Sequence, residues 1–271
     1  MQVIPSPVDG IDLAYDLTRP ATGAASDARP VVLLHGSVLT RAIWRGLGYL
    51  APLAAERPVL RIDIRGHGRS GRPHEAAAYA QEALVADLLA VLDHAGIERA
   101  HLLGYSLGAR IAVTAAVTVP ERVARLVSLG GSAAAQSGAL ETVFFPGVLD
   151  ALRAGGMEAF CAGQGLGPET TDRRRAATRQ AFLAADPLAM AALFEATDAT
   201  PGIDDARLAA CEAPALWMAG TRDQPRCDES RHAAAVMPRG RFVPLPGRTH
   251  GGTLSPAEPI LDEVLPFLWE G

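Results

Sequence analysis

Short continuous apolar runs alternate with amphipathic stretches along most of the chain. Six of these runs have the length and composition of strands that are buried on both faces of a parallel sheet. They are Pro30–Gly36, Pro58–Gly66, Arg99–Tyr105, Arg125–Gly131, Ala213–Gly220 and Gly240–Gly247. Ahead of them, two shorter segments flank the turn Val8-Asp9-Gly10 and predict an antiparallel hairpin.

Helical patterns separate the runs. One apolar stripe at helical spacing predicts a helix that ends near Gly96. Its members are Leu84, Leu88, Val91, Leu92 and Ala95. Further helices are expected over Ile43–Glu56 and over Ser106–Val119, the second stopped by Pro120. Strands that alternate with helices predict an α/β fold, with a mostly parallel eight-stranded sheet flanked by helices.

The chain ends in a further predicted helix. Ser255, Pro256 and Glu258 match a capping box with proline at the first helical position, so we expect the helix to start there. Pro266 lies inside the same helix and should kink it.

Between Gly131 and Ala213 the chain has no strand pattern, and its composition is rich in alanine and arginine. A segment this long inside a compact domain is rarely a plain loop. We therefore expect a helical cap inserted after the sixth strand, over one edge of the sheet. The predicted sheet core comprises residues 1–131 and 206–271, and the predicted cap comprises residues 132–205. The run Arg173–Arg175 is interpreted as a solvated helix face rather than as a phosphate or nucleic-acid contact.

Composition narrows the class of protein. The formal net charge of −5 argues against a nucleic-acid binder, which usually needs a basic face. The three cysteines are unevenly spaced and form no metal-ligand pattern, so we expect free thiols and no bound metal. The first residues lack the features of a secretory leader, and no apolar stretch is long enough to span a membrane. These features predict a cytoplasmic protein with a small-molecule substrate.

A serine stands between a predicted strand and a predicted helix, in Gly104-Tyr105-Ser106-Leu107-Gly108. This G-x-S-x-G pattern in that setting indicates a nucleophile elbow, which leaves the serine hydroxyl at the carboxyl end of the sheet. The turn is so tight that side chains at the two glycine positions would collide with the strand or the helix. The helix also directs its first N–H groups toward the site, which favours developing negative charge.

A serine hydroxyl needs a base to take its proton. Of seven histidines, His250 alone lies in a loop just past the last strand, at the same predicted edge as Ser106. The base in turn needs an acid to hold its tautomer. Asp223 follows the preceding strand at that edge and is preferred over the nearby Asp228 and Glu229 and over Glu141 in the cap. An oxyanion hole needs two backbone donors, for which we predict the N–H groups of Leu107 and Ser37.

Five segments together resemble the α/β-hydrolase superfamily, and in particular its cofactor-free esterases and enol-lactonases. They read VVLLHGS, RIDIRGHGRSGRP, LLGYSLGARIAVTAAVTVPERVARLVSLGGSA, ALWMAGTRDQP and FVPLPGRTHGG. The resemblance implies that Ser106 is the nucleophile, His250 the base and Asp223 the acid. It also implies that the loop from Asp63 to Ser70 is structural, so His67 is given no catalytic role.

The predicted function is cleavage of a carboxylic ester or lactone through an acyl-enzyme. Serine at the elbow argues against the dehalogenases and epoxide hydrolases of this superfamily, which carry aspartate there. Two alternatives stay open: a carbon–carbon bond hydrolase or lyase with the same triad, and a non-catalytic ligand-binding protein on the same scaffold. The predicted cap supplies several phenylalanines, some of which should contact an apolar part of the substrate. They are Phe144, Phe145, Phe160, Phe182 and Phe194.

Overall fold

The computed structural model describes residues 1–21 and 28–269, which form an eight-stranded sheet of order β1-β2-β4-β3-β5-β6-β7-β8. The hairpin strands pair antiparallel with each other, and β2 pairs antiparallel with β4, whereas β3 to β8 are mutually parallel. The strands are β1 (Gln2–Pro5), β2 (Asp12–Thr18), β3 (Val31–Leu34), β4 (Val59–Ile62), β5 (Ala100–Tyr105), β6 (Val123–Leu129), β7 (Ala215–Gly220) and β8 (Gly240–Leu245). The predicted fold class, including the eight strands, is confirmed.

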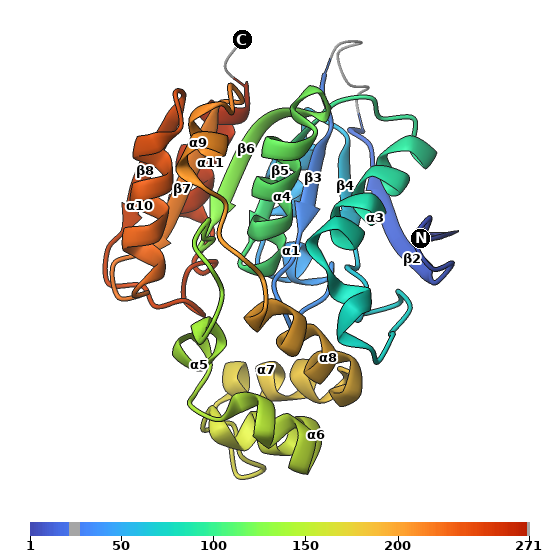
Figure 1. Ribbon diagram of the computed structural model, residues 1–271, viewed down its shortest axis with the longest axis vertical. Coiled ribbons are helices and arrows are strands. Elements are labelled where there is room, and N and C mark those ends of the chain that lie inside the picture. Colours follow the sequence, from blue (N-terminus) through green and yellow to red (C-terminus); the bar gives the residue numbers. More distant parts are fainter. Residues whose placement is uncertain (22–27, 270–271) are drawn as a thin grey trace.

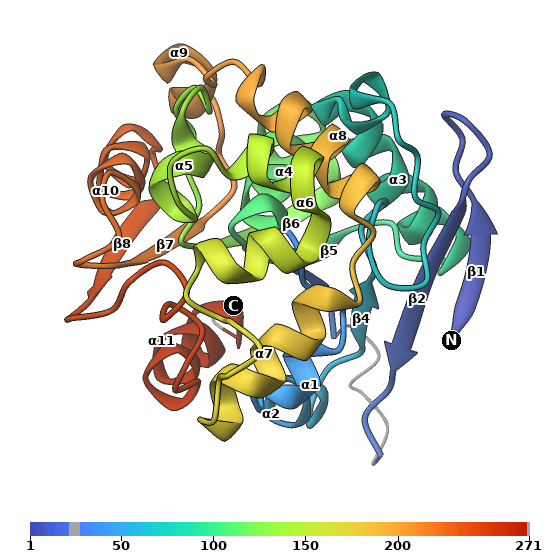
Figure 2. The same ribbon diagram turned by 90° about the horizontal axis from the view of Figure 1, so that it is seen from below.

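Helices cover both faces of the sheet (Figure 1 and Figure 2). One face carries α3, α4 and α10, and the other carries α1, α2 and α11. The bounds are α1 (Ile43–Gly46), α2 (Leu50–Ala54), α3 (Gln81–His94), α4 (Leu107–Thr118), α10 (Arg226–Val236) and α11 (Glu258–Trp269), with 3-10 turns η1 (Ala76–Tyr79) and η2 (Pro120–Arg122).

The apolar runs explain this layering. Successive side chains of a strand point to opposite faces, so a run that is apolar throughout serves two cores. In β3, Val32 and Leu34 join the core beneath α3 and α4, whereas Val31 and Leu33 join the core beneath α1, α2 and α11. Each such buried side chain contributes about 1.5–3 kcal/mol relative to an exposed one. The two cores therefore hold the central strands, and the strand ends that carry the site, in place.

A helical cap follows β6 and lies mainly beyond one end of the sheet (Figure 1). It consists of α5 (Ala139–Val143), α6 (Val148–Gly163), α7 (Arg173–Leu183), α8 (Pro187–Asp198) and α9 (Asp205–Ala209). The predicted insertion after the sixth strand is therefore confirmed, while its boundaries at residues 132 and 205 stay a prediction. Arg173, Arg174 and Arg175 are exposed, as their interpretation as a solvated face requires.

The cap has an aromatic core of its own. Phe160 and Phe194 are fully buried, and Phe144 stacks on Phe194 with ring centroids 5.3 Å apart. Phe182 meets Phe160 edge-on at 5.5 Å, and Phe145 lies 6.1 Å from the same ring. Most of the cap phenylalanines therefore stabilise the cap itself.

Arg110 ties the cap to the core. This arginine lies on α4 and its side chain is buried. Its guanidinium donates to the carbonyl oxygens of Ser132 and Ala134, where the chain enters the cap, and to that of Pro201, where it leaves. Charge-assisted hydrogen bonds are stronger than neutral ones, so one side chain holds both connections.

Two predicted helix bounds were wrong. The predicted helix Ile43–Glu56 is two short helices, α1 and α2, because Gly48 between them has φ of +88°, a left-handed conformation that favours glycine and interrupts a helix. The last helix begins at Glu258, where the Ala257 carbonyl accepts the first helical hydrogen bonds, so Ser255 is not its N-cap. Pro266 lies inside α11 as predicted; the kink stays a prediction.

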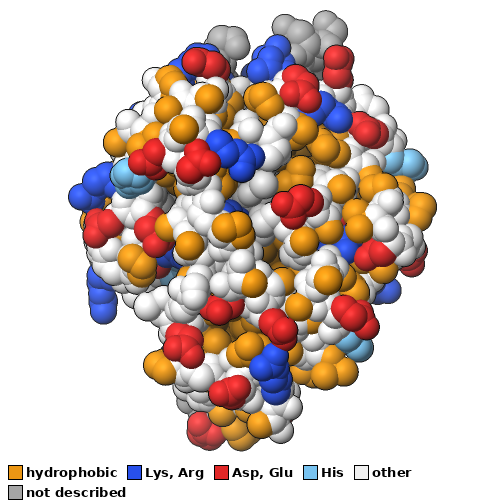
Figure 3. Space-filling view, in the orientation of Figure 1, with side chains coloured by type: hydrophobic (Ala, Val, Ile, Leu, Met, Phe, Trp, Pro, Cys, Tyr) orange, Lys and Arg blue, Asp and Glu red, His pale blue; other side chains and the backbone are white. Residues whose placement is uncertain are grey.

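On the face seen in Figure 3, acidic, basic and apolar side chains are interspersed. Among the described residues, no helix has the length and apolar character needed to cross a membrane. The three cysteines, Cys161, Cys211 and Cys227, are buried free thiols.

Three buried histidines make the fold sensitive to acid. Burial lowers the pKa of His35 to about 4, and that of His67 and His101 to about 3. An unfolded chain restores the ordinary value of about 6.5, so below that pH it binds more protons than the folded protein does. Stability is therefore complete above pH 6.5 and falls as the pH drops toward the folded values.

We expect the free energy of unfolding to fall by about 2 kcal/mol for each of these histidines between pH 7.5 and pH 5. Urea denaturation at pH 7.5 and pH 5.0 measures this directly, before most carboxylates titrate. A denaturation midpoint that is the same at the two pH values would contradict it.

Candidate active site

Ser106 lies at the junction of β5 and α4, in a strained turn. Its φ is +53° and its ψ is −113°, a region that residues other than glycine rarely adopt. Its N–H donates to the Leu129 carbonyl oxygen at 3.0 Å, which continues the sheet pairing up to the serine. The turn leaves the Ser106 Oγ in a cavity at the carboxyl end of the sheet.

The two glycines of the motif are sterically required. A Cβ at Gly104 would lie 2.2 Å from the Gly108 carbonyl oxygen, and a Cβ at Gly108 would lie 2.1 Å from the Leu34 carbonyl oxygen. These neighbours are backbone atoms, which cannot move aside as a flexible side chain can. The close contact between strand and helix that positions Ser106 therefore depends on glycine at these two positions.

The structure brings Ser106, His250 and Asp223 together. His250 Nε2 lies 2.9 Å from Ser106 Oγ, and His250 Nδ1 lies 2.8 Å from Asp223 Oδ2. Asp223 follows β7 and His250 follows β8, so parallel strands bring both loops to the edge that holds Ser106. An ionised carboxylate only accepts hydrogen bonds, so Nδ1 carries the proton and the Nε2 lone pair faces the serine hydroxyl.

Ser37 and Leu107 line the same small cavity as Ser106, which we call the serine cavity; its volume is about 30 Å³. Leu107 is the first residue of α4, so its N–H has no partner within the helix. Ser37 lies in the loop after β3, and the next residue, Val38, has φ of +58°. The start of α4 and the loop after β3 thus both reach the cavity that holds the serine oxygen.

His67 supports the loop that carries Ser37. Its Nε2 accepts the Val38 N–H at 3.1 Å, while its Nδ1 donates to the Arg65 carbonyl oxygen at 3.0 Å. The lowered pKa keeps this imidazole neutral and able to accept. His67 thus holds a strained backbone segment beside Ser106, and the sequence interpretation of it as a structural residue agrees with these contacts.

The serine cavity is more polar than the phenylalanines of the cap suggest. Among these phenylalanines, Phe144 alone lines it, next to Leu140 and Val143. Polar groups make up much of the remaining wall and were missed by the sequence reasoning: Gln81, Arg110, Ser132, Gln136, Thr197, Thr200 and Arg226. The spacing along α4 could have predicted one of them: Arg110 follows Ser106 by four residues and so lies on the same helix face.

The other residues weighed for these positions lie elsewhere. Glu141 is in α5, and Asp228 and Glu229 are in α10, where Glu229 pairs with Arg226. His232 pairs with Asp205 on the surface. Within the described parts of the chain, no group of three or more histidine, cysteine, aspartate or glutamate side chains is placed to hold a metal ion.

Tyr105 lies directly beneath the histidine. Its ring stacks on His250 with centroids 5.4 Å apart, and its hydroxyl donates to the His250 carbonyl oxygen at 3.0 Å. Burial raises the pKa of the hydroxyl, so it stays protonated and able to donate. The tyrosine of the motif therefore positions the histidine loop from below.

We expect Tyr105→Phe to lower kcat about fivefold with little change in KM, because one hydrogen bond of about 1 kcal/mol is lost while the ring remains. Tyr49→Phe is the matched control. The Tyr49 hydroxyl donates to the Leu254 carbonyl oxygen at 2.9 Å, farther along the same segment. If the two variants lose equal stability and equal activity, Tyr105 has only a structural role.

Comparison with known proteins agrees with the fold. The family model for the alpha/beta hydrolase fold matches residues 29–166, about half of the chain. The chain belongs to the α/β-hydrolase family.

Individual relatives have several activities. Pimeloyl-[acyl-carrier protein] methyl ester esterase of Edwardsiella ictaluri (strain 93-146) is 30% identical over 263 residues, which cover 88% of this chain and 93% of that protein. The crystal structure of the enol-lactonase from Burkholderia xenovorans LB400 superposes with a TM-score of 0.81 at 27% identity, covering 96% of this chain and 97% of that one. 2-Hydroxymuconate semialdehyde hydrolase of Pseudomonas sp. (strain CF600) is 38% identical over 104 residues, which span 38% of this chain. The chain spans only about a third of the length of several curated relatives, and 36% of the length of 2-hydroxymuconate semialdehyde hydrolase.

Proposed function

We propose that the protein is a serine hydrolase that cleaves a carboxylic ester or lactone through a Ser106–His250–Asp223 triad and an acyl-enzyme. One observation carries the proposal: an unbroken hydrogen-bond chain runs from Asp223 Oδ2 through both nitrogens of His250 to Ser106 Oγ. The serine is held in a strained turn whose conformation residues other than glycine rarely adopt. Strain of this kind persists where the surrounding structure enforces it, and it is common at reactive sites.

In the first half of the reaction, Ser106 Oγ attacks the carbonyl carbon and His250 Nε2 takes the hydroxyl proton. The carbonyl oxygen becomes an oxyanion, which accepts hydrogen bonds from the N–H groups of Leu107 and Ser37. His250 then gives the proton to the departing alkoxide and an acyl-enzyme remains; the alcohol of an ester leaves, whereas that of a lactone stays attached to the acyl group. Asp223 stabilises the transient imidazolium without taking its proton.

In the second half, a water molecule attacks the acyl carbonyl and gives one proton to His250 Nε2. The same two N–H groups hold the second oxyanion. Collapse of this intermediate breaks the bond to Ser106 Oγ, which regains the proton from His250, and the carboxylic acid departs. No group outside the chain, apart from water and the substrate, is needed to balance the cycle.

The serine cavity limits how a substrate enters. Its volume of about 30 Å³ is far below the roughly 300–1,000 Å³ of small-molecule sites. We infer that side chains of the cap move before an ester reaches Ser106. We infer that Leu140, Val143 and Phe144 contact the apolar part of the substrate, since they supply the apolar side of the cavity.

Two observations favour an ester or lactone bond over a carbon–carbon bond as the one that is cleaved. Both the methyl ester esterase and the enol-lactonase align along nearly all of this chain, whereas the carbon–carbon bond hydrolase 2-hydroxymuconate semialdehyde hydrolase aligns over little more than a third. The loop His35-Gly36-Ser37-Val38-Leu39-Thr40 also departs from the H-G-S-G-P-G that carbon–carbon hydrolases of this superfamily commonly carry. A carbon–carbon bond hydrolase with the same triad is the alternative. It is supported by the 38% identity with 2-hydroxymuconate semialdehyde hydrolase in the matched segment.

A substrate panel tests the proposal. It compares short-chain p-nitrophenyl esters, lactones and vinylogous diketones as substrates for the wild type, with Ser106→Ala as the background. We expect kcat/KM for the best ester or lactone to exceed that for any diketone by at least a hundredfold. The reverse ranking would replace the proposal with carbon–carbon bond hydrolysis, and no turnover of any class would favour the ligand-binding alternative.

A further inference from the structure

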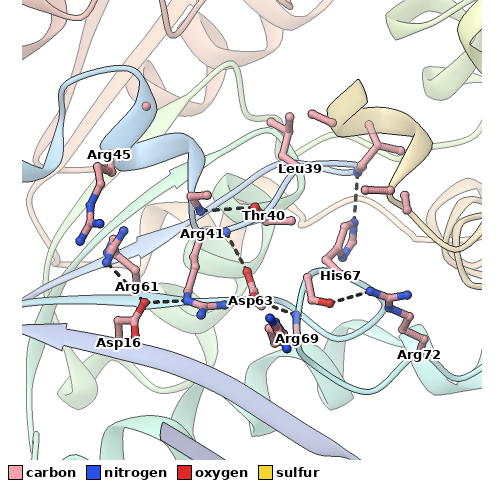
Figure 4. Close-up of a pocket in the computed structure, with 17 residues that line it drawn as sticks. Asp16, Leu39, Thr40, Arg41, Arg45, Arg61, Asp63, His67, Arg69 and Arg72 are labelled. Atoms are coloured by element: carbon pink, nitrogen blue, oxygen red, sulfur yellow. Dashed lines mark hydrogen bonds and ion pairs between the residues drawn. The ribbon is translucent and has the colours of Figure 1, made fainter. Parts of the chain in front are cut away.

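A second and larger cavity lies beside the loop that carries Ser37. It has a volume of about 570 Å³, which is in the range of small-molecule sites. Residues 38–42, the start of the chain after β4, and the carboxyl end of α7 form its walls (Figure 4). We call it the arginine groove after five lining residues: Arg41, Arg45, Arg61, Arg69 and Arg72.

The positive charge of the groove exceeds its negative charge. Five guanidinium groups line it, against the two carboxylates of Asp16 and Asp63. Arg41 forms ion pairs with both carboxylates, and Arg61 pairs with Asp16. His67, the remaining titratable group of the lining, is held neutral by burial, which lowers its pKa to about 3. The groove therefore carries an excess of three positive charges.

Three of the arginines carry that excess. Within residues 1–21 and 28–269, the guanidinium groups of Arg45, Arg69 and Arg72 have no carboxylate partner. The Arg72 guanidinium donates to the Gly68 carbonyl oxygen at 2.7 Å, which does not neutralise it. Arg45 and Arg69 are exposed, so their side chains are free to turn toward an occupant.

Arg61 is the most unusual member of the set. Its side chain is only 5% exposed, and its Nε has no hydrogen-bond partner among the described residues. Its ion pair with Asp16 is long at 3.4 Å. Burial and the nearby charges of Arg45 and Arg41 lower its pKa, and Figure 4 shows the Arg45 and Arg61 guanidinium groups next to each other. A buried donor without a partner, close to like charges, is costly unless an anion satisfies it.

We propose that the arginine groove binds a small dianion, either a phosphate monoester or a dicarboxylate. Guanidinium groups present fixed pairs of donors that match phosphate and carboxylate oxygens, and an excess of three positive charges favours two negative charges over one. The proposal does not depend on the proposed hydrolase function, since the groove and the serine cavity have no lining residue in common.

The groove and the serine cavity are nevertheless neighbours along the chain. Val38 and Leu39 line the groove, whereas the preceding residue, Ser37, lines the serine cavity. The Arg41 N–H donates to Asp63 Oδ1 at 2.8 Å, so the far end of the same loop is anchored in the groove wall. A bound dianion therefore lies against the outer side of the loop that carries the predicted oxyanion donor.

Isothermal titration calorimetry of the wild type tests the proposal. The titrants are inorganic phosphate and succinate, with acetate as a monoanion control, in a low-salt buffer at pH 7.5. We expect saturable binding at one site for at least one dianion, and binding of acetate at least tenfold weaker. Binding of phosphate but not succinate would show that the groove takes a phosphate group. Binding of succinate but not phosphate would show that it takes a dicarboxylate.

Variants place the ligand in the groove. Arg45→Gln and Arg69→Gln change exposed side chains, so the fold should be retained, which a thermal melt verifies. Each is expected to weaken dianion binding about tenfold, as for the loss of a charged hydrogen bond. Arg239→Gln, an exposed arginine at another site, should bind like the wild type. Absence of saturable binding, equal binding of acetate, or wild-type affinity in both groove variants would overturn the proposal.

Discussion

Replacing Ser106 by alanine is expected to lower kcat for ester hydrolysis by about 10⁴- to 10⁶-fold, because the nucleophile is removed while the oxyanion donors remain. Alanine keeps the Cβ of serine, so the strained turn at φ +53° is neither relieved nor made worse. KM should change little, since no binding group is lost. The measurement is steady-state kinetics on the best ester or lactone of the panel.

Ser137→Ala is the matched control for this variant. Ser137 is an exposed serine of the cap, away from the hydrogen-bond chain, and its replacement should leave kcat unaltered. A Ser106→Ala variant that retains more than a tenth of wild-type kcat, with its thermal midpoint preserved, would show that another group attacks the substrate.

The second large effect is expected for Asp223→Asn, with a loss of about 10⁴ in kcat. Asparagine fills the same space, but its amide can donate to His250 Nδ1, where the carboxylate could only accept. The ring then adopts the tautomer with the proton on Nε2, and the lone pair that faces Ser106 Oγ disappears. The predicted result is a correctly folded protein whose histidine is unable to take the serine proton.

Asp228→Asn serves as the control, since Asp228 lies five residues farther along but is exposed on α10. It should keep wild-type kcat. An Asp223→Asn variant within tenfold of the wild type would mean that the His250 tautomer is set by some other contact, and the role of Asp223 would have to be withdrawn.

Parallel topology explains why so much of the site could be predicted from sequence. Side chains that follow parallel strands converge at one edge of a sheet, so the order of strands alone places Ser106, Asp223 and His250 near one another. The apolar runs identified the strands because burial on both faces favours apolar side chains at successive positions. The distances of 2.8 and 2.9 Å between the three side chains depend on loop conformations that no pattern encodes.

What the sequence could not predict depends on contacts between distant segments. Tyr105 contacts His250 across 145 residues, so its role as a support appears only in three dimensions. The arginine groove depends on the antiparallel register that places Asp16 opposite Arg61. The helix predicted over Ile43–Glu56 failed for a local reason, because Gly48 takes a positive φ that an amphipathic pattern does not reveal.

Covalent labelling shows whether Ser106 is an activated nucleophile. A fluorophosphonate probe reacts with an activated serine, and mass spectrometry then identifies the labelled peptide. We expect one adduct per chain, on Ser106, in the wild type and none in Ser106→Ala. No adduct in the wild type, or undiminished labelling in Ser106→Ala, would mean that Ser106 is not the nucleophile.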